Sequence, residues 1–351
     1  MKGIGPYEWD FTTEMEKKQV KTTKGHIHKL PTAGMSRAEW LLERKKSLGG
    51  SDMGAVLGLN PWASPYSVWA EKTGKVPDKE ENEAMRLGRD LEDYVCHRFM
   101  EVSGLKVQRH NYILRNDNLP CIHANVDRLN LRDKFGLEAK TASALNASKF
   151  TGGEFPGSYY AQCVTYLAVT EYKRWYLAAL VLGKEFHVYQ MTRIENDVCP
   201  EWCDSSVYVS PQEIEALGIV ARDFWRDHVE KDVPPPVDGT AATSEALGRI
   251  MNRSNEQKHV DLTGIQATVR AYLKLAAENK ERNELMEKYA NQIKTYLGDA
   301  AGGSCELAKI SWKVQARKSF DLKKFQKDHP EMDLTGYYNY STSRPFKVTV
   351  N

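Results

Sequence analysis

The order of apolar and polar positions predicts that helices and strands alternate along most of the chain. Apolar side chains recur at steps of three and four, the spacing of a helix, in segments 86–102, 158–169 and 265–297. Two short apolar runs, 174–181 and 185–190, are typical of buried strands. Strands that carry acidic residues lie between the first two helices. This order predicts an α/β domain with a mixed central sheet flanked by helices.

The same pattern divides the chain into four parts. Residues 1–35 are polar and rich in lysine, so we expect a solvated N-terminal arm. Periodic apolar segments fill residues 36–232, which we interpret as the main domain. Residues 233–240 contain three consecutive prolines, and this composition favours a stiff linker. Residues 241–351 then form a smaller α+β accessory unit.

This C-terminal unit is predicted to contain one long helix and two strands. The helix covers residues 265–297, and Gly298 supplies a natural end. It either packs on its own unit or pairs with a partner helix. Strand patterns cover residues 308–314 and 346–350. Residues 305–327 carry seven lysines and arginines against two acids, so this segment is either a phosphate-facing patch or a solvated face.

Composition and charge exclude several classes of protein. Of the 351 residues, 41% are hydrophobic and 27% are charged, so the chain is neither disordered throughout nor fibrous. No run of about 18 apolar residues and no N-terminal apolar core is present, and we expect neither a membrane span nor a secretory signal. Six cysteines without a CxxC pair are typical of reduced thiols in the cytoplasm. The net charge of +2 implies that any nucleic-acid binding uses local basic patches.

The most informative segment is residues 122–141, which is predicted to form a strand, a polar turn and a second strand. The first strand carries Asp127, and the second carries Glu138 and Lys140. Because side chains two positions apart in a strand share a face, Glu138 and Lys140 point the same way. Pairing of the two strands would bring Asp127 next to Glu138. The backbone carbonyl of Ala139 would lie close to the same site.

Two carboxylates held together repel one another unless a cation lies between them. Their oxygens suit a hard ion, either Mg²⁺ or Mn²⁺. An adjacent ammonium such as Lys140 could lower the pKa of a metal-bound water or stabilise the charge of an attacked phosphate. On its own the tripeptide Glu138-Ala139-Lys140 favours a surface salt bridge, but the neighbouring segments change that interpretation.

Two predicted helices add polar side chains to the same region. Glu92 lies on the otherwise apolar face of helix 86–102, where a carboxylate is costly unless it is paired or binds a metal. The alternative is a carboxylate near the first turn, which the helix dipole favours. Gln162 and Tyr166 lie four residues apart on one face of helix 158–169.

Together these residues resemble the PD-(D/E)xK nuclease superfamily, and more closely the YqaJ-like viral recombinase group related to lambda exonuclease. The resemblance covers residues 37–230 and follows the order of the family's motifs. The matching pieces are Trp40-x3-Arg44, Ser51, Gly88-x3-Glu92, Asp117, Asp127, Glu138-Ala139-Lys140 and Tyr159-x-Ala161-Gln162.

The resemblance implies a metal site with a defined set of ligands. Asp127 and Glu138 resemble the carboxylate ligands, and the Ala139 carbonyl resembles the third ligand. Glu92 resembles the helix carboxylate of the metal site. Two Mg²⁺ ions are implied, with Mn²⁺ as the alternative ion.

The resemblance also implies roles for four other residues. Lys140 resembles the catalytic lysine, and Gln162 resembles the helix glutamine that supports the site. Arg44 and Ser51 fall where the family binds the 5′-terminal phosphate, and a guanidinium with a hydroxyl suits a dianionic phosphate. Without the family, Arg44 would be interpreted as a surface arginine on a helix.

Five further positions match the family only in part or have no assigned role. Val126 replaces a proline before the first acid, and Asn125 replaces a serine that contacts a phosphate. Asp117 lies ten residues before the first acid, as in lambda-like members, but it also fits a plain turn. Met85 lies where relatives place an apolar residue that helps to part the strands, and a core methionine is the alternative. Tyr159 belongs to a matched motif and could support the site.

The function implied by the resemblance is a Mg²⁺-dependent 5′→3′ exonuclease for double-stranded DNA ends. It would release mononucleotides and leave a 3′ single strand for recombination. The relatives form rings around DNA, which implies a homo-oligomer, with a trimer favoured, and a single-strand annealing recombinase as partner. If the chain is encoded by a phage or prophage, the expected location is the host cytoplasm.

Two other functions stay open at this point. One is an endonuclease or single-strand nuclease on the same fold, against which Arg44 and Ser51 argue. The other is a catalytically inactive DNA-binding scaffold for recombination. The intact set of Asp127, Glu138 and Lys140 argues against that alternative.

Overall fold

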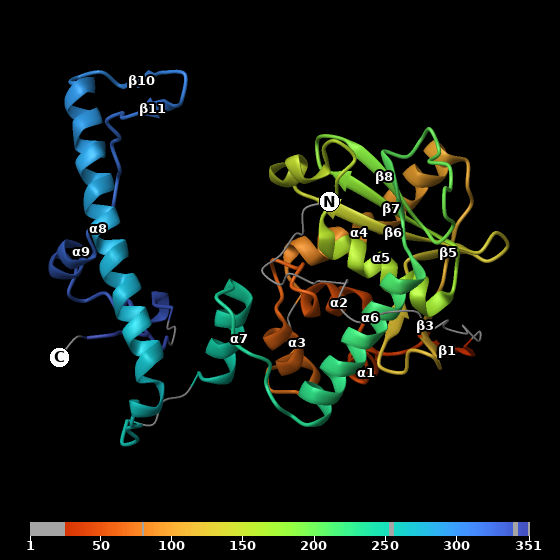
Figure 1. The fold of residues 1–351 in the computed structure, drawn as a ribbon. Coiled ribbons are helices and arrows are strands. Elements are labelled where there is room, and N and C mark those ends of the chain that lie inside the picture. Colours follow the sequence, from red (N-terminus) through yellow and green to blue (C-terminus); the bar gives the residue numbers. More distant parts are fainter. Residues whose placement is uncertain (1–24, 79–80, 253–255, 340–342, 350–351) are drawn as a thin grey trace. The chain divides into compact units, whose positions relative to one another are not determined.

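The structure is a computed structural model that describes residues 25–78, 81–252, 256–339 and 343–349. The chain divides into two compact units, Met1–Asn252 and Arg253–Asn351. Figure 1 shows a sheet covered by helices in the first unit and one long helix in the second. Within the described ranges, no helix combines the length and the apolar character needed to cross a bilayer.

The first unit is built on a six-stranded mixed sheet. Its strands are β2 (Gln108–Arg109), β5 (Arg128–Asn130), β6 (Phe135–Ala142), β7 (Arg174–Val181), β8 (Phe186–Thr192) and β9 (Ser205–Tyr208), in the order β2-β5-β6-β7-β8-β9. β6 runs parallel to β7 and β8 runs parallel to β9, whereas the other neighbours are antiparallel. The predicted fold class, a mixed sheet flanked by helices with a smaller C-terminal unit that contains a long helix, is confirmed.

Seven α-helices are described in the first unit. They are α1 (Arg37–Lys45), α2 (Gly50–Val56), α3 (Pro65–Lys72), α4 (Glu83–Ser103), α5 (Gly157–Thr170), α6 (Pro211–Phe224) and α7 (Ala241–Ile250). A 3₁₀ segment (Ala144–Phe150) precedes α5, and α6 continues into a π-helical stretch (Trp225–Glu230). The helices predicted at 86–102 and 158–169 are α4 and α5, each slightly longer than predicted.

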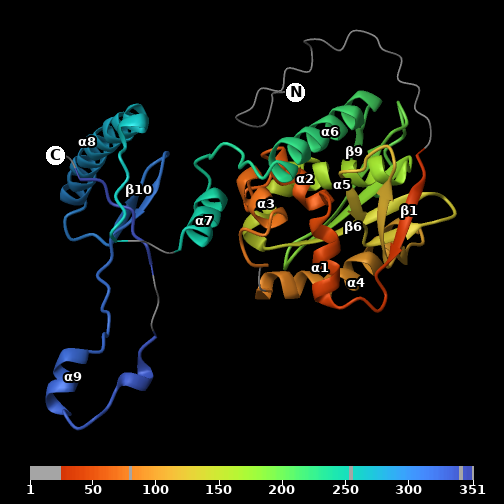
Figure 2. The same cartoon turned by 90° about the horizontal axis from the view of Figure 1, so that it is seen from below.

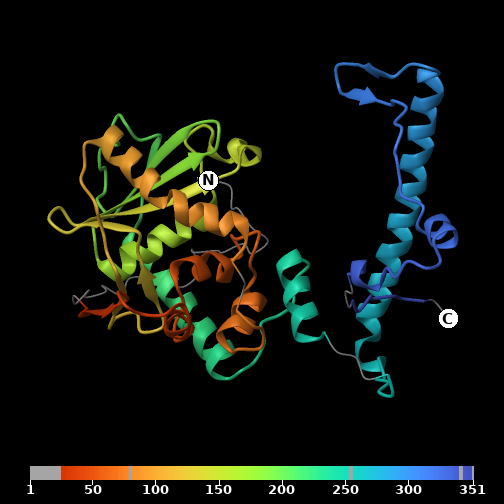
Figure 3. The ribbon, with the colours of Figure 1, turned by 180° about the vertical axis from the view of Figure 1, so that it is seen from behind.

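Alternate residues of the central strands face two different hydrophobic cores. On β7, Tyr176 and Ala178 pack in the core that contains the buried face of α4. Trp175 and Leu177 pack in the core on the side of α5. Figures 1 and 3 show α4 and α5 on opposite faces of the sheet. Gly136 on β6 makes room for Trp175, because a Cβ at this position would lie 2.2 Å from the indole ring.

Small residues let α2 approach α5 closely. A Cβ on Gly50 would lie 2.7 Å from the Tyr166 ring, and a Cβ on Gly54 would lie 3.2 Å from the backbone of Ser158. Side chains at these two positions would push the helices apart. The contact therefore holds Ser51, in the first turn of α2, near the helix that carries Gln162.

A second, three-stranded sheet has the order β1-β3-β4. Its strands are β1 (Ile27–Pro31), β3 (Tyr112–Asn116) and β4 (His123–Asn125). Residues 27–31 were predicted to belong to a solvated arm, but they pair with β3, and His28 Nε2 lies 2.7 Å from Asp117 Oδ1. Residues 1–24 of the predicted arm lie outside the described residues.

The first strand of the predicted hairpin is interrupted. β4 belongs to the three-stranded sheet and ends at Asn125, whereas β5 begins at Arg128 in the six-stranded sheet. Val126 is buried at the crossing, with 7% of its surface exposed. Asp127 therefore occupies the point where the chain passes from one sheet to the other.

α7 belongs to the first compact unit, although the sequence placed residues 241–250 after the linker. Thr243 Oγ1 donates a hydrogen bond to Ser64 Oγ at 2.7 Å. Arg249 Nη2 donates to the Pro77 carbonyl at 2.5 Å. These contacts and the burial of its small residues against α3 attach α7 to the first unit, so the division between units falls later than the proline-rich segment.

The second unit contains α8 (Gln266–Leu297), the hairpin of β10 (Gly302–Ser304) and β11 (Lys309–Ser311), and α9 (Leu322–Asp328). α8 confirms the predicted long helix, and Gly298 follows it with a φ of +59°. Of the two predicted strands, 308–314 is found only as the short β11. The described residues 346–349 form no strand, so that prediction is wrong for them. Figure 2 shows the irregular stretch that joins β11 to α9.

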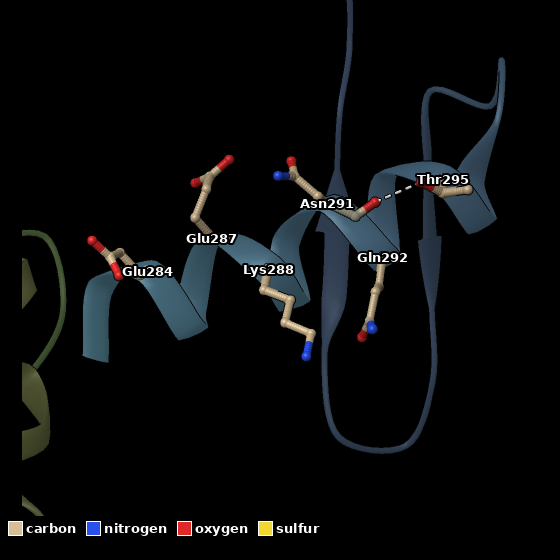
Figure 4. Close-up of a pocket in the computed structure, with 6 residues that line it drawn as sticks. All are labelled: Glu284, Glu287, Lys288, Asn291, Gln292 and Thr295. Carbon is tan, nitrogen blue, oxygen red and sulfur yellow. Dashed lines mark hydrogen bonds between the residues drawn. The ribbon is translucent and has the colours of Figure 1, made fainter. Parts of the chain in front are cut away.

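A shallow depression runs along α8 (Figure 4). Its lining residues are Glu284, Glu287, Lys288, Asn291, Gln292 and Thr295. Thr295 Oγ1 donates a hydrogen bond to the Asn291 carbonyl at 2.8 Å. All six residues come from one helix and their charges are of both signs, so the depression does not gather polar groups around one point.

Candidate active site

The pairing of β5 with β6 brings two carboxylates together. Arg128 faces Leu137 in the antiparallel ladder, which leaves Asp127 beside Glu138. Asp127 Oδ2 accepts a hydrogen bond from the Ala139 amide at 2.8 Å. One carboxylate oxygen of Asp127 is thus hydrogen-bonded to the backbone of the neighbouring strand.

Glu138 is a buried carboxylate on β6, with only 2% of its surface exposed. Its Oε1 accepts a hydrogen bond from Gln162 Nε2 at 2.7 Å and lies 2.6 Å from Lys140 Nζ. Gln162 Nε2 also donates to the Tyr166 hydroxyl at 2.8 Å, one turn further along α5. These contacts orient the carboxylate through one oxygen only. Glu138 Oε2 is buried and forms no hydrogen bond with any residue in the described part of the chain.

Lys140 shares a face of β6 with Glu138, as the spacing of two residues predicted. Its ammonium also lies 5.2 Å from the centroid of the Tyr159 ring, a cation–π contact. Burial lowers the pKa of Lys140, but the carboxylates of Glu138 and Asp127 outweigh burial and raise it. Without a bound cation, Lys140 is therefore positively charged at neutral pH.

The pKa of Asp127 lies well above the usual range for an aspartate. Burial is the largest cause, and the charges of Glu138 and Glu92 add to it. Lys140 and the Ala139 amide act in the opposite direction without cancelling the effect. The two neighbouring carboxylates are therefore costly to ionise together, and a bound cation would remove that cost.

The oxygen atoms at this site fit a hard divalent cation. A buried carboxylate oxygen without a donor, such as Glu138 Oε2, is costly in the interior of a protein. Coordination of a metal by this oxygen and by the Asp127 carboxylate would satisfy both groups. Oxygen donors of this kind are the ligands that Mg²⁺ and Mn²⁺ prefer.

Glu92 contacts Arg128 instead of joining the carboxylate pair directly. Arg128 Nη1 donates to Glu92 Oε1 at 2.6 Å and to the Asp127 carbonyl at 2.6 Å, and Arg128 Nη2 contacts Asp93. The Arg128 side chain is 6% exposed, so this pairing is largely withdrawn from solvent. Among the described residues, no three histidine, cysteine, aspartate or glutamate side chains form a group that could hold a metal. The structure thus brings together two of the three predicted carboxylates.

A second cluster of polar side chains forms where α1 ends and α2 begins. Arg44 Nη2 donates a hydrogen bond to Ser51 Oγ at 3.4 Å. The Arg44 guanidinium lies 4.6 Å from the centroid of the Trp40 ring, which restricts its orientation. Arg44 Nε is buried and has no hydrogen-bond partner among the residues that the structure describes. This arrangement leaves donor capacity for an anion.

A buried ion pair contacts the backbone of the cluster that contains Arg44 and Ser51. Lys72 Nζ on α3 lies 2.6 Å from Asp52 Oδ2 and donates to the Arg44 carbonyl at 2.8 Å. Asp52 Oδ2 also accepts a hydrogen bond from the Gly49 amide at 2.7 Å. Burial raises the pKa of Asp52, but Lys72 and Arg44 outweigh burial and lower it. Asp52 is therefore ionised at neutral pH and ties α1, α2 and α3 together.

His123 on β4 connects this cluster to the strand that leads to Asp127. The His123 amide donates to the Leu48 carbonyl at 2.8 Å, and His123 Nδ1 lies 2.9 Å from Ser47 Oγ. Burial is the main cause that lowers the pKa of His123 to about 3, and the charges of Lys72 and Arg44 add to it. His123 is consequently a neutral structural residue at physiological pH.

Comparison with known proteins identifies the family of the chain. Residues 39–173 match the family described as the YqaJ-like viral recombinase domain. Over 302 residues the chain is 36% identical to "Uncharacterized protein YqaJ" of Bacillus subtilis (strain 168), and the match covers 85% of this chain and 90% of that protein. The chain belongs to the YqaJ family.

Solved structures similar to this YqaJ-family chain include two exonucleases. The alkaline exonuclease LHK-Exo from Laribacter hongkongensis, in complex with dAMP, is 16% identical with a TM-score of 0.44, and the match covers 56% of this chain and 94% of that chain. A phage related exonuclease from Haemophilus somnus 129PT is 12% identical with a TM-score of 0.36, and the match covers 59% of this chain and 97% of that chain. The family assignment itself rests on the sequence matches.

Three other predicted residues of this YqaJ-family chain lie on α4, β4 and the turn after β3. Met85 is 46% exposed in the first turn of α4, so it is not a core residue. Asn125 ends β4, and its Nδ2 is buried without a hydrogen-bond partner in the described structure. Asp117 contacts His28 on β1.

Sequence reasoning missed two charged residues that organise the YqaJ-family site. Arg128 directly follows Asp127, but its partners Glu92 and Asp93 lie on α4, so the pairing depends on how α4 lies against the sheet. Lys72 likewise gave no signal, because its partner Asp52 lies on another helix and only the folded chain brings them together.

Proposed function

We propose that this YqaJ-family chain is a metal-dependent nuclease of phage-type recombination that degrades double-stranded DNA from its 5′ ends. The observation that carries the proposal is the carboxylate pair of Asp127 and Glu138, with Lys140 beside it and Glu138 Oε2 left without a donor. The family's description as a viral recombinase domain supports the assignment to recombination. Mononucleotides and a 3′ single strand would be the products.

The cation would be held by the carboxylates of Asp127 and Glu138 and by the Ala139 carbonyl. We propose Mg²⁺ as the ion, with two ions expected and Mn²⁺ as the alternative. When bound, the metal supplies an activated water for attack and a positive charge that stabilises the leaving oxygen. Gln162 positions the Glu138 carboxylate by donating to Oε1, which leaves Oε2 available.

Lys140 contributes a fixed positive charge to the reaction. Its ammonium lies 2.6 Å from Glu138 Oε1, so it adjoins the oxygens that would bind the cation. The two carboxylates raise its pKa, so its ammonium is protonated and can donate hydrogen bonds. We therefore assign Lys140 to stabilising negative charge on the attacked phosphate.

Glu92 would act together with Arg128. Its negative charge contributes to the raised pKa of Asp127, which means that it adds to the attraction for a cation at the carboxylate pair. The 2.6 Å contact with Arg128 keeps it in that position. Direct coordination by Glu92 would require Arg128 to give up or share this contact.

Arg44 and Ser51 are proposed to bind the 5′-terminal phosphate. Their donors adjoin one another at 3.4 Å, and a guanidinium with a hydroxyl matches a terminal phosphate better than an internal diester. The pair of Asp52 and Lys72 would position them. Recognition of a 5′-phosphate is the basis for the proposed 5′→3′ direction and for the preference for DNA ends.

The wider assembly also belongs to this proposal. Residues 36–232 would act as the nuclease domain, α7 would pack on it, and the unit that follows α7 would be the accessory unit. We propose a ring-shaped homo-oligomer around DNA, with three subunits favoured, and a single-strand annealing recombinase as the partner that receives the product. The reaction would take place in the cytoplasm, which is the host cytoplasm if the chain is encoded by a phage or prophage.

Metal binding by a single-residue variant tests the chemistry of the proposal. Mg²⁺ would be titrated by calorimetry into the wild-type protein, Glu138→Ala and the exposed control Glu195→Ala. We expect tight binding in the wild type and the control and its loss in Glu138→Ala. Hydrolysis of a linear duplex should follow the same order and stop when Mg²⁺ is chelated. Undiminished Mg²⁺ binding by Glu138→Ala would remove Glu138 from the ligand set.

A further inference from the structure

The net positive charge of this chain comes from one segment of the second unit. The basic segment, defined as residues 305–327, contains seven lysines and arginines and only two acids, a net charge of +5. Since the whole chain has a net charge of +2, the remainder carries a net charge of −3. Without the basic segment, the chain would therefore have a net negative charge.

The cations of the basic segment are exposed and have no acidic partners. They are Lys309, Lys313, Arg317, Lys318, Lys323, Lys324 and Lys327, all of them exposed. In the part of the chain that the structure describes, none of the seven lies within 4.0 Å of a carboxylate. One of the two acids, Asp321, caps α9 by accepting a hydrogen bond from the Lys324 amide at 3.0 Å. The segment is therefore not a solvated face with balanced charges.

α8 provides an internal comparison. Its cations alternate with acids and form pairs one turn apart, such as Lys274 with Glu278 and Lys280 with Glu284. That is the pattern of an ordinary solvated helix surface. The basic segment follows α8 in the same compact unit but lacks this pairing, so its charge is available to an external anion.

Exposed aromatic side chains lie between the cations. Trp312 is 47% exposed and precedes Lys313, and Phe320 is 71% exposed and lies between Lys318 and Lys323. Residues 312–320 form neither helix nor strand, as the chain between β11 and α9 in Figure 2 shows. Cations and aromatic rings that are interspersed along an exposed irregular stretch match the phosphates and the unstacked bases of a single-stranded nucleic acid. In a duplex the bases are stacked and offer no free faces.

We propose that the basic segment binds single-stranded DNA, with its lysines and arginines on phosphates and with Trp312 and Phe320 against bases. That the nucleic acid is DNA rests on the proposed function, because the nuclease would leave a 3′ single strand. The binding would be independent of sequence and strongly dependent on salt. The second unit would thus retain the product strand and keep the enzyme on its substrate.

Binding of a fluorescent oligothymidine to the full chain, measured by anisotropy in the presence of a chelator, tests this proposal without any catalysis. The oligonucleotide would have about 30 nucleotides, which exceeds the usual binding-site size of about 4–16 nucleotides. The test variant replaces Lys313, Arg317 and Lys318 by glutamine. The matched control replaces Lys274, Lys280 and Arg282 of α8 by glutamine, an identical change of charge on residues that already have acidic partners.

We expect the test variant to bind oligothymidine about a hundredfold more weakly than the wild type at 0.1 M salt. The slope of log affinity against log salt concentration should become shallower by about two, which corresponds to three lost phosphate contacts on a single strand. The control variant should bind within about twofold of the wild type. Trp312→Ala should weaken oligothymidine binding about tenfold and leave binding of a duplex of equal length unchanged. Mg²⁺-dependent degradation of a short duplex should persist in all of these variants.

Three results would overturn the proposal. Equal weakening by the test and control variants would attribute the effect to net charge alone. Unchanged binding by the test variant would remove the basic segment from DNA binding. Tighter binding of the duplex than of the single strand, with no effect of Trp312→Ala, would replace single strands by duplex as the ligand. Because these measurements exclude metal, failure of the nuclease proposal would leave their outcome unaffected.

Discussion

The two compact units of this chain differ in how they hold their charged side chains. In the first unit, Lys72, Arg128 and Glu138 are buried and each has a partner of opposite charge within 2.6 Å. In the second unit, the cations of the basic segment are exposed and lie beyond ion-pair distance of any described carboxylate. Both arrangements suit a nucleic acid, but the first suits a reaction at one phosphate and the second suits binding along a strand.

Buried pairs impose a fixed geometry. Removing a charge from water is costly, so such groups are retained only where their partners are well placed, and a fixed arrangement is what a reaction at one phosphate requires. Exposed, unpaired cations impose little geometry and exchange readily between phosphates. This difference is what we expect if the first unit performs the proposed chemistry and the second unit holds the proposed single strand. The following predictions, from the largest expected effect to the smallest, are designed to break or sharpen this distinction.

Lys140→Ala should produce the largest effect on activity. Loss of a charge that stabilises the attacked phosphate should reduce the turnover of a linear duplex by about 10²–10³-fold, while the fold and DNA binding persist. Single-turnover hydrolysis with saturating Mg²⁺ measures this loss, and Lys184→Ala in the exposed turn after β7 is the control. Unchanged turnover in Lys140→Ala would remove the lysine from the mechanism.

Asp52→Asn should destabilise the first unit by about 3–5 kcal/mol, because it leaves the largely buried ammonium of Lys72 without its counter-ion. Urea unfolding followed by the tryptophan fluorescence of the full chain measures this change. The matched control is Asp232→Asn, which removes the partner of the exposed Lys75 and should cost less than about 1 kcal/mol. An equal loss of unfolding free energy in the two variants would mean that burial does not strengthen the contribution of the Asp52–Lys72 pair to stability.

His123 should make stability depend on pH. Its pKa is about 3 in the folded protein and about 6.5 in an unfolded chain, so below about pH 6.5 the unfolded chain takes up a proton that the folded protein refuses. Stability should therefore fall as the pH drops from 6.5 towards 3, by about 2 kcal/mol at pH 5.

Unfolding at pH 7 and pH 5 measures this dependence. His123→Gln keeps a polar side chain next to Ser47 and should reduce the difference between the two pH values, whereas the exposed control His97→Gln should not. A wild-type protein equally stable at both pH values, with His123→Gln identical to it, would contradict the assignment of His123 as a neutral buried residue.

Arg44→Ala should have the smallest of these effects and a selective one. Loss of one charge-assisted hydrogen bond should reduce the preference for a 5′-phosphorylated end over a 5′-hydroxyl end by about tenfold. Lys46→Ala, an exposed neighbour of the same helix end, is the control. If hydrolysis of both kinds of end falls equally in Arg44→Ala, the arginine is a general DNA contact and does not recognise the terminal phosphate.

The sequence predicted those parts of the molecule that depend on local periodicity. α4, α5 and α8 were found within a few residues of their predicted limits, because apolar spacing of three and four directly reflects the buried face of a helix. The shared face of Glu138 and Lys140 followed from the alternation of a strand. The mixed sheet followed from the order of these elements.

Features that depend on long-range contacts were not predicted. The break between β4 and β5 leaves no mark on the alternation around Asp127, because it arises from the division of the chain between two sheets. Pairing of β1 with β3 joins residues far apart in sequence, and a polar segment with few apolar residues gives no sign of it. The contact of Glu92 with Arg128 likewise depends on how α4 lies against the sheet.

The most direct test of the nuclease assignment uses a linear duplex labelled separately at the two ends of one strand. It would be incubated with Mg²⁺, with and without a 5′-phosphate, beside a covalently closed circle of the same sequence. The account predicts labelled mononucleotides from the 5′ side first, faster release from the phosphorylated end, and an intact circle. Cleavage of the circle would contradict it in favour of an endonuclease. DNA binding without any cleavage would contradict it in favour of an inactive recombination scaffold.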